Sequence, residues 1–296
     1  MRKIKDVYLP GSEWVYYKVY MSEESADRFL THDFFPLLKQ LYALKIINNC
    51  FFIRYRDSFP HLRIRFKINQ RENFALLINI MFVKMEREKQ KKECWKVVLD
   101  TYQREIERYG ARMIELSEKI FGFDSVCLLN LLRLMKNNNS DNKRWMLAIP
   151  LIDSFFNIFE LDLDNKAKIM AQLAKQYKSE FGFNEFNSKQ FNELNRKYKN
   201  IIDLLIRNKM EGELWIKVFK LIRRKYDSIY SELHNEKINF KTDQSTVFLN
   251  FITSHIHMMF NRLFKSQARV HEMVIYELLS RYYKGQLAKM KYNRCS

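Results

Sequence analysis

Apolar and polar residues in the first third of the chain follow the periods of short strands and of helices in turn. Residues 13–21 are dense in aromatic and β-branched side chains, which predicts a strand. Residues 51–56 and 62–68 form two further runs, and in the second run apolar and basic residues alternate with the period of a half-buried strand. Because only residues 57–61 separate these runs, we expect them to form a β-hairpin.

Helical patterns lie between and after these strands. Residues 22–44 carry apolar side chains at helical spacing, with Ser22 as an N-cap and Pro36 as a kink or break. A second helix is predicted near residues 71–87, and residues 94–102 indicate another strand. The order β-α-β-β-α-β predicts a module built on an antiparallel sheet.

From residue 112 onward the pattern is that of long helices, and no strand is predicted. The last two helices are expected at residues 245–264 and 270–283, with Gly285 as a C-cap near the end. The fold class is therefore α+β, a sheet module over 1–111 followed by a helical part over 112–296, together forming a single domain. The predicted breaks between helices fall at residues 137–142, 182–188 and 235–243.

Composition narrows the classes of protein and of partner. The chain has 296 residues, 47% of them hydrophobic, with few Gly and Pro, which predicts a globular protein rather than a disordered one. Its net charge of +18 favours acidic partners such as nucleic acid, anionic lipid or an acidic peptide. No run predicts a membrane span or a secretory signal, and the four cysteines lack a metal-ligand spacing, so we expect a soluble, cytoplasmic protein without a metal.

The predicted hairpin concentrates basic side chains. Arg54, Arg56, Arg63 and Arg65 are expected close together, with His61 in the connection. Neighbouring guanidinium groups repel each other unless an anion lies between them. Two interpretations stay open: a solvated basic face paired with local carboxylates such as that of Asp57, or a clamp for a carboxylate or phosphate.

Two further segments carry candidate chemistry. Residues 102–110 hold Glu105 and Arg108 beside Gly110, which suits a turn with positive φ, although the charged residues could also form surface pairs at helical spacing. His257 lies in a predicted helix, four residues before Asn261. A histidine near several arginines is suited to acid–base chemistry on an anion, but a helical histidine is also often a hydrogen-bonded core residue.

Taken together and in order, these segments resemble a known family, the C-terminal elimination domain of class I lanthipeptide dehydratases, also called the thiopeptide-type bacteriocin biosynthesis domain. The resemblance extends from Trp14 to Tyr283, and departs from the family at Ser58 and Ala111, where the family often has Pro and Gly. The segments that carry it read WVYYKVY from Trp14, FFIRYRD from Phe51 with HLR from His61, YQREIERYG from Tyr102, and HM with NR from His257 and Asn261.

The resemblance implies a lyase that expels glutamate from glutamylated Ser or Thr of a ribosomal precursor peptide, leaving dehydroalanine or dehydrobutyrine. It implies catalytic roles for Arg56, Glu105, Arg108 and His257, and leaves open whether Glu105 or His257 is the base. No cofactor or metal is expected. The substrate-binding residues that we predict are Arg54, His61, Arg63, Asn261 and Arg262.

Partners follow from the same resemblance. The family's full-length members carry a large tRNA-dependent glutamylation domain, so this chain is interpreted as a split component that needs a separate glutamylating protein and a leader-containing precursor peptide. A homo-oligomer is left open. Two alternatives also stay open: a related pyridine-forming [4+2] cycloaddition enzyme, and a basic, non-catalytic module that docks a peptide or a tRNA. Convergence of Arg54, Arg56, Arg108 and His257 on one cavity would favour elimination over a docking module.

Overall fold

A computed structural model describes residues 4–138, 140–183, 188–235 and 246–295 of the chain. The chain folds into two compact units. Unit 1 comprises residues 1–133 and 250–266, and unit 2 comprises residues 134–249 and 267–296. All of the predicted site residues fall in unit 1.

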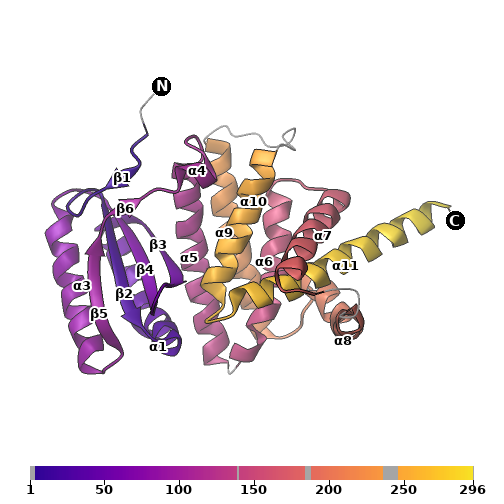
Figure 1. Cartoon of the computed structure of the whole chain (residues 1–296), viewed down its shortest axis with the longest axis horizontal. Coiled ribbons are helices and arrows are strands. Elements are labelled where there is room, and N and C mark those ends of the chain that lie inside the picture. The colour runs from indigo at the N-terminus through magenta and orange to yellow at the C-terminus, as the bar shows by residue number, and fades with distance from the viewer. Residues whose placement is uncertain (1–3, 139, 184–187, 236–245, 296) are drawn as a thin grey trace. The chain divides into compact units, whose positions relative to one another are not determined.

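The sheet module of unit 1 is formed largely as predicted. The strands of its four-stranded sheet are antiparallel and lie in the order β3-β4-β2-β5, and a separate ribbon pairs β1 (Val7–Tyr8) with β6 (Tyr102–Gln103). Figure 1 shows α3 beside β5 and α5 beside β3, on the two flanks of the sheet. The sheet consists of β2 (Trp14–Met21), β3 (Ile47–Arg56), β4 (Pro60–Ile68) and β5 (Cys94–Asp100), and helices α3 (Asn73–Gln90) and α5 (Ile114–Asn137) flank it.

The helix predicted over residues 22–44 contains three segments. Ser22 caps α1 (Glu23–Arg28) as expected, and a π-helix, η1 (Phe29–Phe34), precedes α2 (Phe35–Ala43). The irregular turn lies just before Pro36, where the amide of Phe35 donates to Leu30 in the five-residue pattern of a π-helix. Because proline cannot donate to the preceding turn, this is the point where an ordinary helix is weakest.

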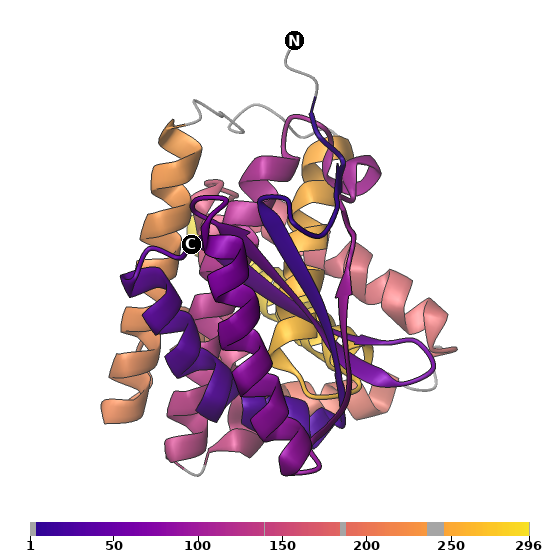
Figure 2. The ribbon, with the colours of Figure 1, turned by 90° about the vertical axis from the view of Figure 1, so that its left-hand side faces the viewer.

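Two apolar clusters lie on opposite faces of the sheet. One includes Val15, Phe52 and Ile64 with residues of α1 to α3, and Figure 2 shows α2 and α3 in front of the strands. The other includes Trp14 and Phe51 with residues of α5 and of α10 (Thr246–Leu263). Successive side chains of a strand point to opposite faces, which explains why Phe51 and Phe52 enter different clusters.

Unit 2 is helical throughout its described residues. A buried carboxylate, that of Asp153, accepts hydrogen bonds from Lys166 (2.8 Å) and from Tyr283 (2.8 Å), and so joins three of its helices. No helix of the described chain has a stretch long and apolar enough to cross a membrane. The helices are α6 (Arg144–Ile158), α7 (Leu163–Glu180), α8 (Ser188–Ile206), α9 (Glu213–Asn235) and α11 (Ala268–Cys295), with a 3-10 turn, η2, at Asp141–Lys143.

Some predicted boundaries need correction. Gly285 is not a C-cap, because α11 runs through it to Cys295. Breaks also occur around Glu160 and Asn208, two residues with positive φ that the sequence pattern did not mark. The predicted break at 235–243 lies, except for Asn235 at the end of α9, outside the described residues, and that at 182–188 is described only in part.

Candidate active site

Helix α10 is fixed to the outer edge of β3 by side chains that pair with the strand's backbone. Asn261 accepts a hydrogen bond from the amide of Arg54 (2.9 Å) and donates one to its carbonyl (2.7 Å). At Phe52 the amide donates to Ser125 of α5 (3.3 Å), and the carbonyl accepts from Nε of Arg262 (2.8 Å). An edge strand normally leaves such groups unpaired. Here the hydrogen bonds to the backbone of β3 hold α10, which carries His257, in a fixed register beside the strand.

Arg262 and Arg54 are both buried and both have protein partners. Arg262 is fully buried, its Nη1 lies 3.0 Å from the carboxylate of Asp124, and burial lowers the pKa of its guanidinium. Arg54 donates through Nη2 to Asp27 (2.6 Å) and through Nε to the carbonyl of Arg262 (3.2 Å). These contacts join β3, α1 and α10, and substrate binding by these residues and by Asn261 stays a prediction.

Arg56 follows Arg54 on the same face of β3, at the strand's end, but lies in solvent. Its Nη2 is 2.9 Å from the carboxylate of Glu23, and both side chains are exposed. Glu23 and Asp27 are one turn apart on α1, so the two arginines of the strand pair with two carboxylates of the helix. The exposed pair is worth little stability, which leaves Arg56 available to an incoming anion.

The four hairpin arginines do not lie together, contrary to expectation. Arg54 is opposite Leu62 in the β3–β4 register, so Arg63 and Arg65 point to the other face of the sheet. Asp57 does not pair with an arginine in any described contact; it accepts a hydrogen bond from the amide of Phe59.

His61 and Arg63 lie on that opposite face. The ring of His61 is packed between those of Tyr20 and Tyr55, and the guanidinium of Arg63 is 3.3 Å from the centroid of Tyr55. Nε of Arg63 donates to Nε2 of His61 (3.3 Å), and Nδ1 of His61 donates to the carbonyl of Phe59 (3.1 Å). This pattern fits a neutral ring, and burial lowers the pKa of His61. Substrate binding by His61 and Arg63 stays a prediction.

Arg108 extends from the short helix α4 (Ile106–Tyr109) to α10. Its Nε donates to Oγ of Ser254 (3.2 Å), and its Nη1 is 3.5 Å from the carboxylate of Glu105. Gly110 ends this helix with φ of 79°, as the sequence predicted. The ring of Tyr109, the last residue of this helix, packs on Phe121 of α5. The segment is therefore anchored by Tyr109 while Arg108 and Glu105 remain accessible.

On α10, His257 lies between Ser254, which binds Arg108, and Asn261, which binds the backbone of β3. It is half-buried, three residues after Ser254 and four before Asn261, so all three residues share one face of the helix. One neighbouring turn thus holds Arg108, and the other is bound to β3 at Arg54. Arg108, near Glu105, thus contacts the face of α10 that carries His257, while Arg56 stands at the end of the strand that α10 borders.

Other residues that shape the site were missed from the sequence. Arg104, next to Glu105, is not a surface residue: its Nε and Nη2 donate to Glu118 of α5 (2.7 and 2.6 Å). Arg65, which was predicted in the basic cluster of the hairpin, is instead buried against the rings of Tyr16 and Tyr102. Helical spacing could have singled out Ser254, but the partners of Arg104 and Arg54 depend on tertiary structure. Among the described residues, no three His, Cys, Asp or Glu side chains gather as a metal ion would require.

Comparison with known proteins decides the family. Residues 14–283 match the family described as Lantibiotic biosynthesis dehydratase C-term. The chain belongs to this family. Among its curated relatives, the chain is 29% identical to the Nisin biosynthesis protein NisB of Lactococcus lactis subsp. lactis over 273 residues, which are 91% of this chain. It is 27% identical to the Subtilin biosynthesis protein SpaB of Bacillus subtilis over 182 residues, or 59% of the chain.

Solved structures share the fold of this dehydratase C-terminal domain. The tRNA dependent lantibiotic dehydratase MibB from Microbispora sp. 107891 aligns over 94% of the chain with a TM-score of 0.74 and 20% identity. TsrL aligns over 93% with a TM-score of 0.60 and 14% identity, and the pyridine synthase TbtD from thiomuracin biosynthesis aligns over 92% with a TM-score of 0.54 and 11% identity. The chain spans 25% of the length of NisB, 17% of SpaB and 29% of the MibB chain, but 95% of TsrL and 98% of TbtD.

Proposed function

We propose that the chain eliminates glutamate from glutamylated Ser or Thr residues of a ribosomal precursor peptide. The observation that carries the proposal is that Arg108 is hydrogen-bonded to Ser254, which shares one face of α10 with His257, in a member of the dehydratase C-terminal family. A guanidinium from α4 and an imidazole of α10 along the same helix face can serve an anionic substrate and a proton transfer.

The proposed reaction breaks two bonds of the modified residue. A base removes the proton from the α-carbon, the bond between the β-carbon and the ester oxygen breaks, and glutamate leaves as its carboxylate. A carbon–carbon double bond remains in the peptide. His257 would move the proton, and Glu105 would either serve as the base or hold Arg108 in place. Arg56 and Arg108 would bind the leaving carboxylate and stabilise the charge on the peptide oxygen, a donor contribution of about 3 to 4 kcal/mol.

The partners in this proposal are the precursor peptide, with its leader, and a separate protein that forms the glutamyl ester by a tRNA-dependent reaction. MibB is itself named a tRNA dependent lantibiotic dehydratase, and NisB and SpaB are named for nisin and subtilin biosynthesis, which supports the class of substrate. A cytoplasmic location and assembly into a homo-oligomer stay predictions.

The test incubates a pre-glutamylated precursor peptide with the protein and follows loss of the glutamyl group by mass spectrometry. His257→Ala is expected to slow release by roughly 10²- to 10⁴-fold with peptide binding retained, since a proton-transfer residue acts in the transition state. The matched control is His32→Ala, because His32 is an exposed histidine of η1 in the same unit.

Two results would contradict this function. If the unaltered protein releases no glutamate from any cognate ester, or if His257→Ala releases it at the original rate, the elimination mechanism is wrong. A pyridine-forming cycloaddition or a docking role would then replace it. The first would be recognised by ring formation between two dehydroalanines, and the second by peptide or tRNA binding without chemistry.

A further inference from the structure

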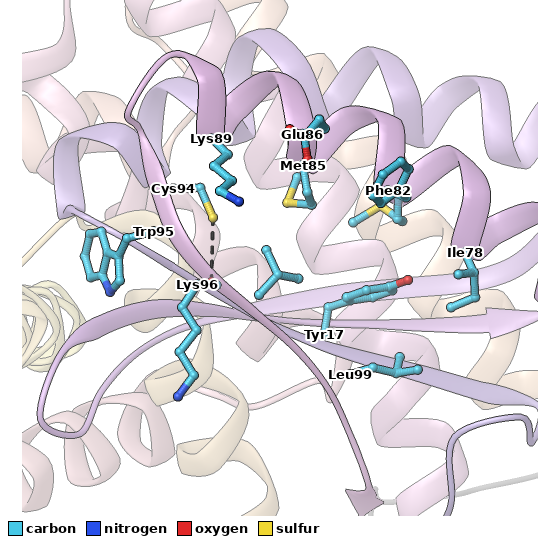
Figure 3. Close-up of a pocket in the computed structure, with 12 residues that line it drawn as sticks. Tyr17, Ile78, Phe82, Met85, Glu86, Lys89, Cys94, Trp95, Lys96 and Leu99 are labelled. Carbon is cyan, nitrogen blue, oxygen red and sulfur yellow. Dashed lines mark hydrogen bonds between the residues drawn. The ribbon is translucent and has the colours of Figure 1, made fainter.

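Away from the site, a groove of about 400 Å³ lies between α3 and β5. Apolar side chains of both elements line it and point toward one another: Ile78, Phe82 and Met85 from the helix, with Leu99 from the strand (Figure 3). Of these, Phe82 and Leu99 remain exposed, by 65% and 36%, whereas Met85 is buried. Large apolar side chains that stay exposed along one groove mark an interaction site more often than a free surface.

The strand beside the groove has an unpaired edge. β5 is the last strand in the order β3-β4-β2-β5, and no described strand pairs with its outer side. Its apolar residues Trp95, Val97 and Leu99 are exposed by 52%, 39% and 36%. The opposite end of the sheet, at β3, is closed by Asn261, Arg262 and Ser125. An extended peptide can therefore add to this sheet at β5, where α3 forms the other wall.

Charges around the groove select the kind of peptide. Glu86 and Lys89 both line the groove on the side of α3, so the charge there is mixed. Lys96 points away from α3 across the other face of β5, over the ring of Tyr20. Within the part of the chain that the structure describes, neither lysine forms an ion pair with a carboxylate.

The geometry points to an extended, acidic peptide as the occupant, added to β5 as a fifth strand beneath α3. Its main chain would pair with the open edge, and alternate side chains would enter the apolar groove. The side chains between them would face Lys96, so they would be acidic. The inference goes beyond the proposed function, since it assigns a surface rather than a reaction, and the two can fail separately.

The probe is a fluorescein-labelled peptide of about eight residues, the length of a strand, in which valine alternates with glutamate. Fluorescence anisotropy should report binding that weakens from low ionic strength to about 0.15 M salt. Phe82→Glu and Lys96→Glu should each weaken it at least tenfold. Leu44→Glu and Lys39→Glu, at exposed positions of unit 1 outside the groove, should leave it unchanged.

Main-chain pairing has its own control in the probe. Two further probes are N-methylated, one at its odd positions and the other at its even positions. One of them should lose binding and the other should keep it, because a strand directs successive amides to opposite sides. The assay needs no glutamyl ester, so it stands whether or not elimination occurs. Absence of binding, equal binding by Phe82→Glu, or tolerance of both methylated probes would overturn the inference. A concentration-dependent dimer dispersed by Val97→Lys would overturn it in favour of a second copy.

Discussion

Ser254 binds Arg108 one helical turn before His257, and the proposed elimination uses both of these side chains. Its hydroxyl accepts from Nε of Arg108, and its helix presents His257 one turn later. Ser254 itself is buried and has no acid–base character near neutral pH. Its role in the proposed reaction is therefore to position Arg108, which separates its expected behaviour from that of His257.

Ser254→Ala should lower the rate of glutamate release roughly tenfold, which corresponds to the loss of one hydrogen bond to a charged group at about 1.4 kcal/mol. Ser254→Thr, which keeps the hydroxyl, should restore most of that rate. The measurement is single-turnover release from the glutamylated peptide. Equal rates for the alanine and threonine variants would show that the hydroxyl has no positioning role.

His61 should make the protein less stable in mild acid. Burial lowers its pKa in the folded state, so below the ordinary value near 6.5 the unfolded chain binds a proton that the folded chain does not, and stability falls as pH falls. The cost is at most about 1.4 kcal/mol per pH unit. Urea unfolding at neutral pH and in mild acid should show a smaller loss for His61→Gln than for the unaltered protein. Equal losses would contradict a neutral, buried ring.

Among the elements, β3 and α10 show why sequence reasoning reached the fold but only part of the site. Strong alternation and short turns made β2, the β3–β4 hairpin and β5 predictable. The side chains that close the edge of β3 were not, since Asn261 meets Arg54 across 207 positions of the chain. Likewise, the carboxylate partners of Arg54 and Arg56 come from α1, which a search for nearby acidic residues could not find. The motif resemblance supplied His257 and Arg108, but not Ser254.

The ends of helices were also predicted only in part from the sequence. Gly285 looked like a terminator, yet one glycine inside a helix costs only about 1 kcal/mol, and α11 continues through it. Conversely, Glu160 and Asn208 adopt positive φ without being glycine. Local composition therefore marks where a helix is weak, while packing decides where it ends.

Asn261→Ala should destabilise unit 1, because both hydrogen bonds that join α10 to Arg54 are lost. Leaving two backbone groups of β3 without partners should cost about 2 to 4 kcal/mol. Asn138→Ala is the matched control, since the amide of Asn138 donates to its own helix from an exposed position. Urea denaturation measures both. A loss below about 0.5 kcal/mol for Asn261→Ala would show that water replaces these bonds without cost.

At the scale of the whole molecule, unit 1 is not continuous in sequence. It needs residues 250–266 in addition to 1–133. Those later residues carry Arg262, whose guanidinium neutralises the buried carboxylate of Asp124. An N-terminal piece of the chain therefore lacks part of its own core.

A fragment of residues 1–133 is accordingly expected not to fold cooperatively. Without α10, the carbonyl of Phe52 and the backbone of Arg54 lose their partners at the edge of β3. Asp124 also loses its ion pair with Arg262, and breaking a buried ion pair typically costs about 3 to 5 kcal/mol. Amide shift dispersion and urea unfolding, with the full chain as control, are the measurements. A dispersed spectrum with a sharp unfolding transition would show that α10 is dispensable to this unit.

The two edges of the four-stranded sheet differ, and this difference limits how copies of the protein could polymerise. A filament built through sheets requires two open edges on every copy, so that each new copy leaves an edge for the next. Of the two edges of this sheet in the described structure, the β3 edge is occupied by side chains and only the β5 edge is open to another strand. Growth from β5 would therefore stop at a pair, so the side chains that hold α10 in place also protect the sheet against fibre formation.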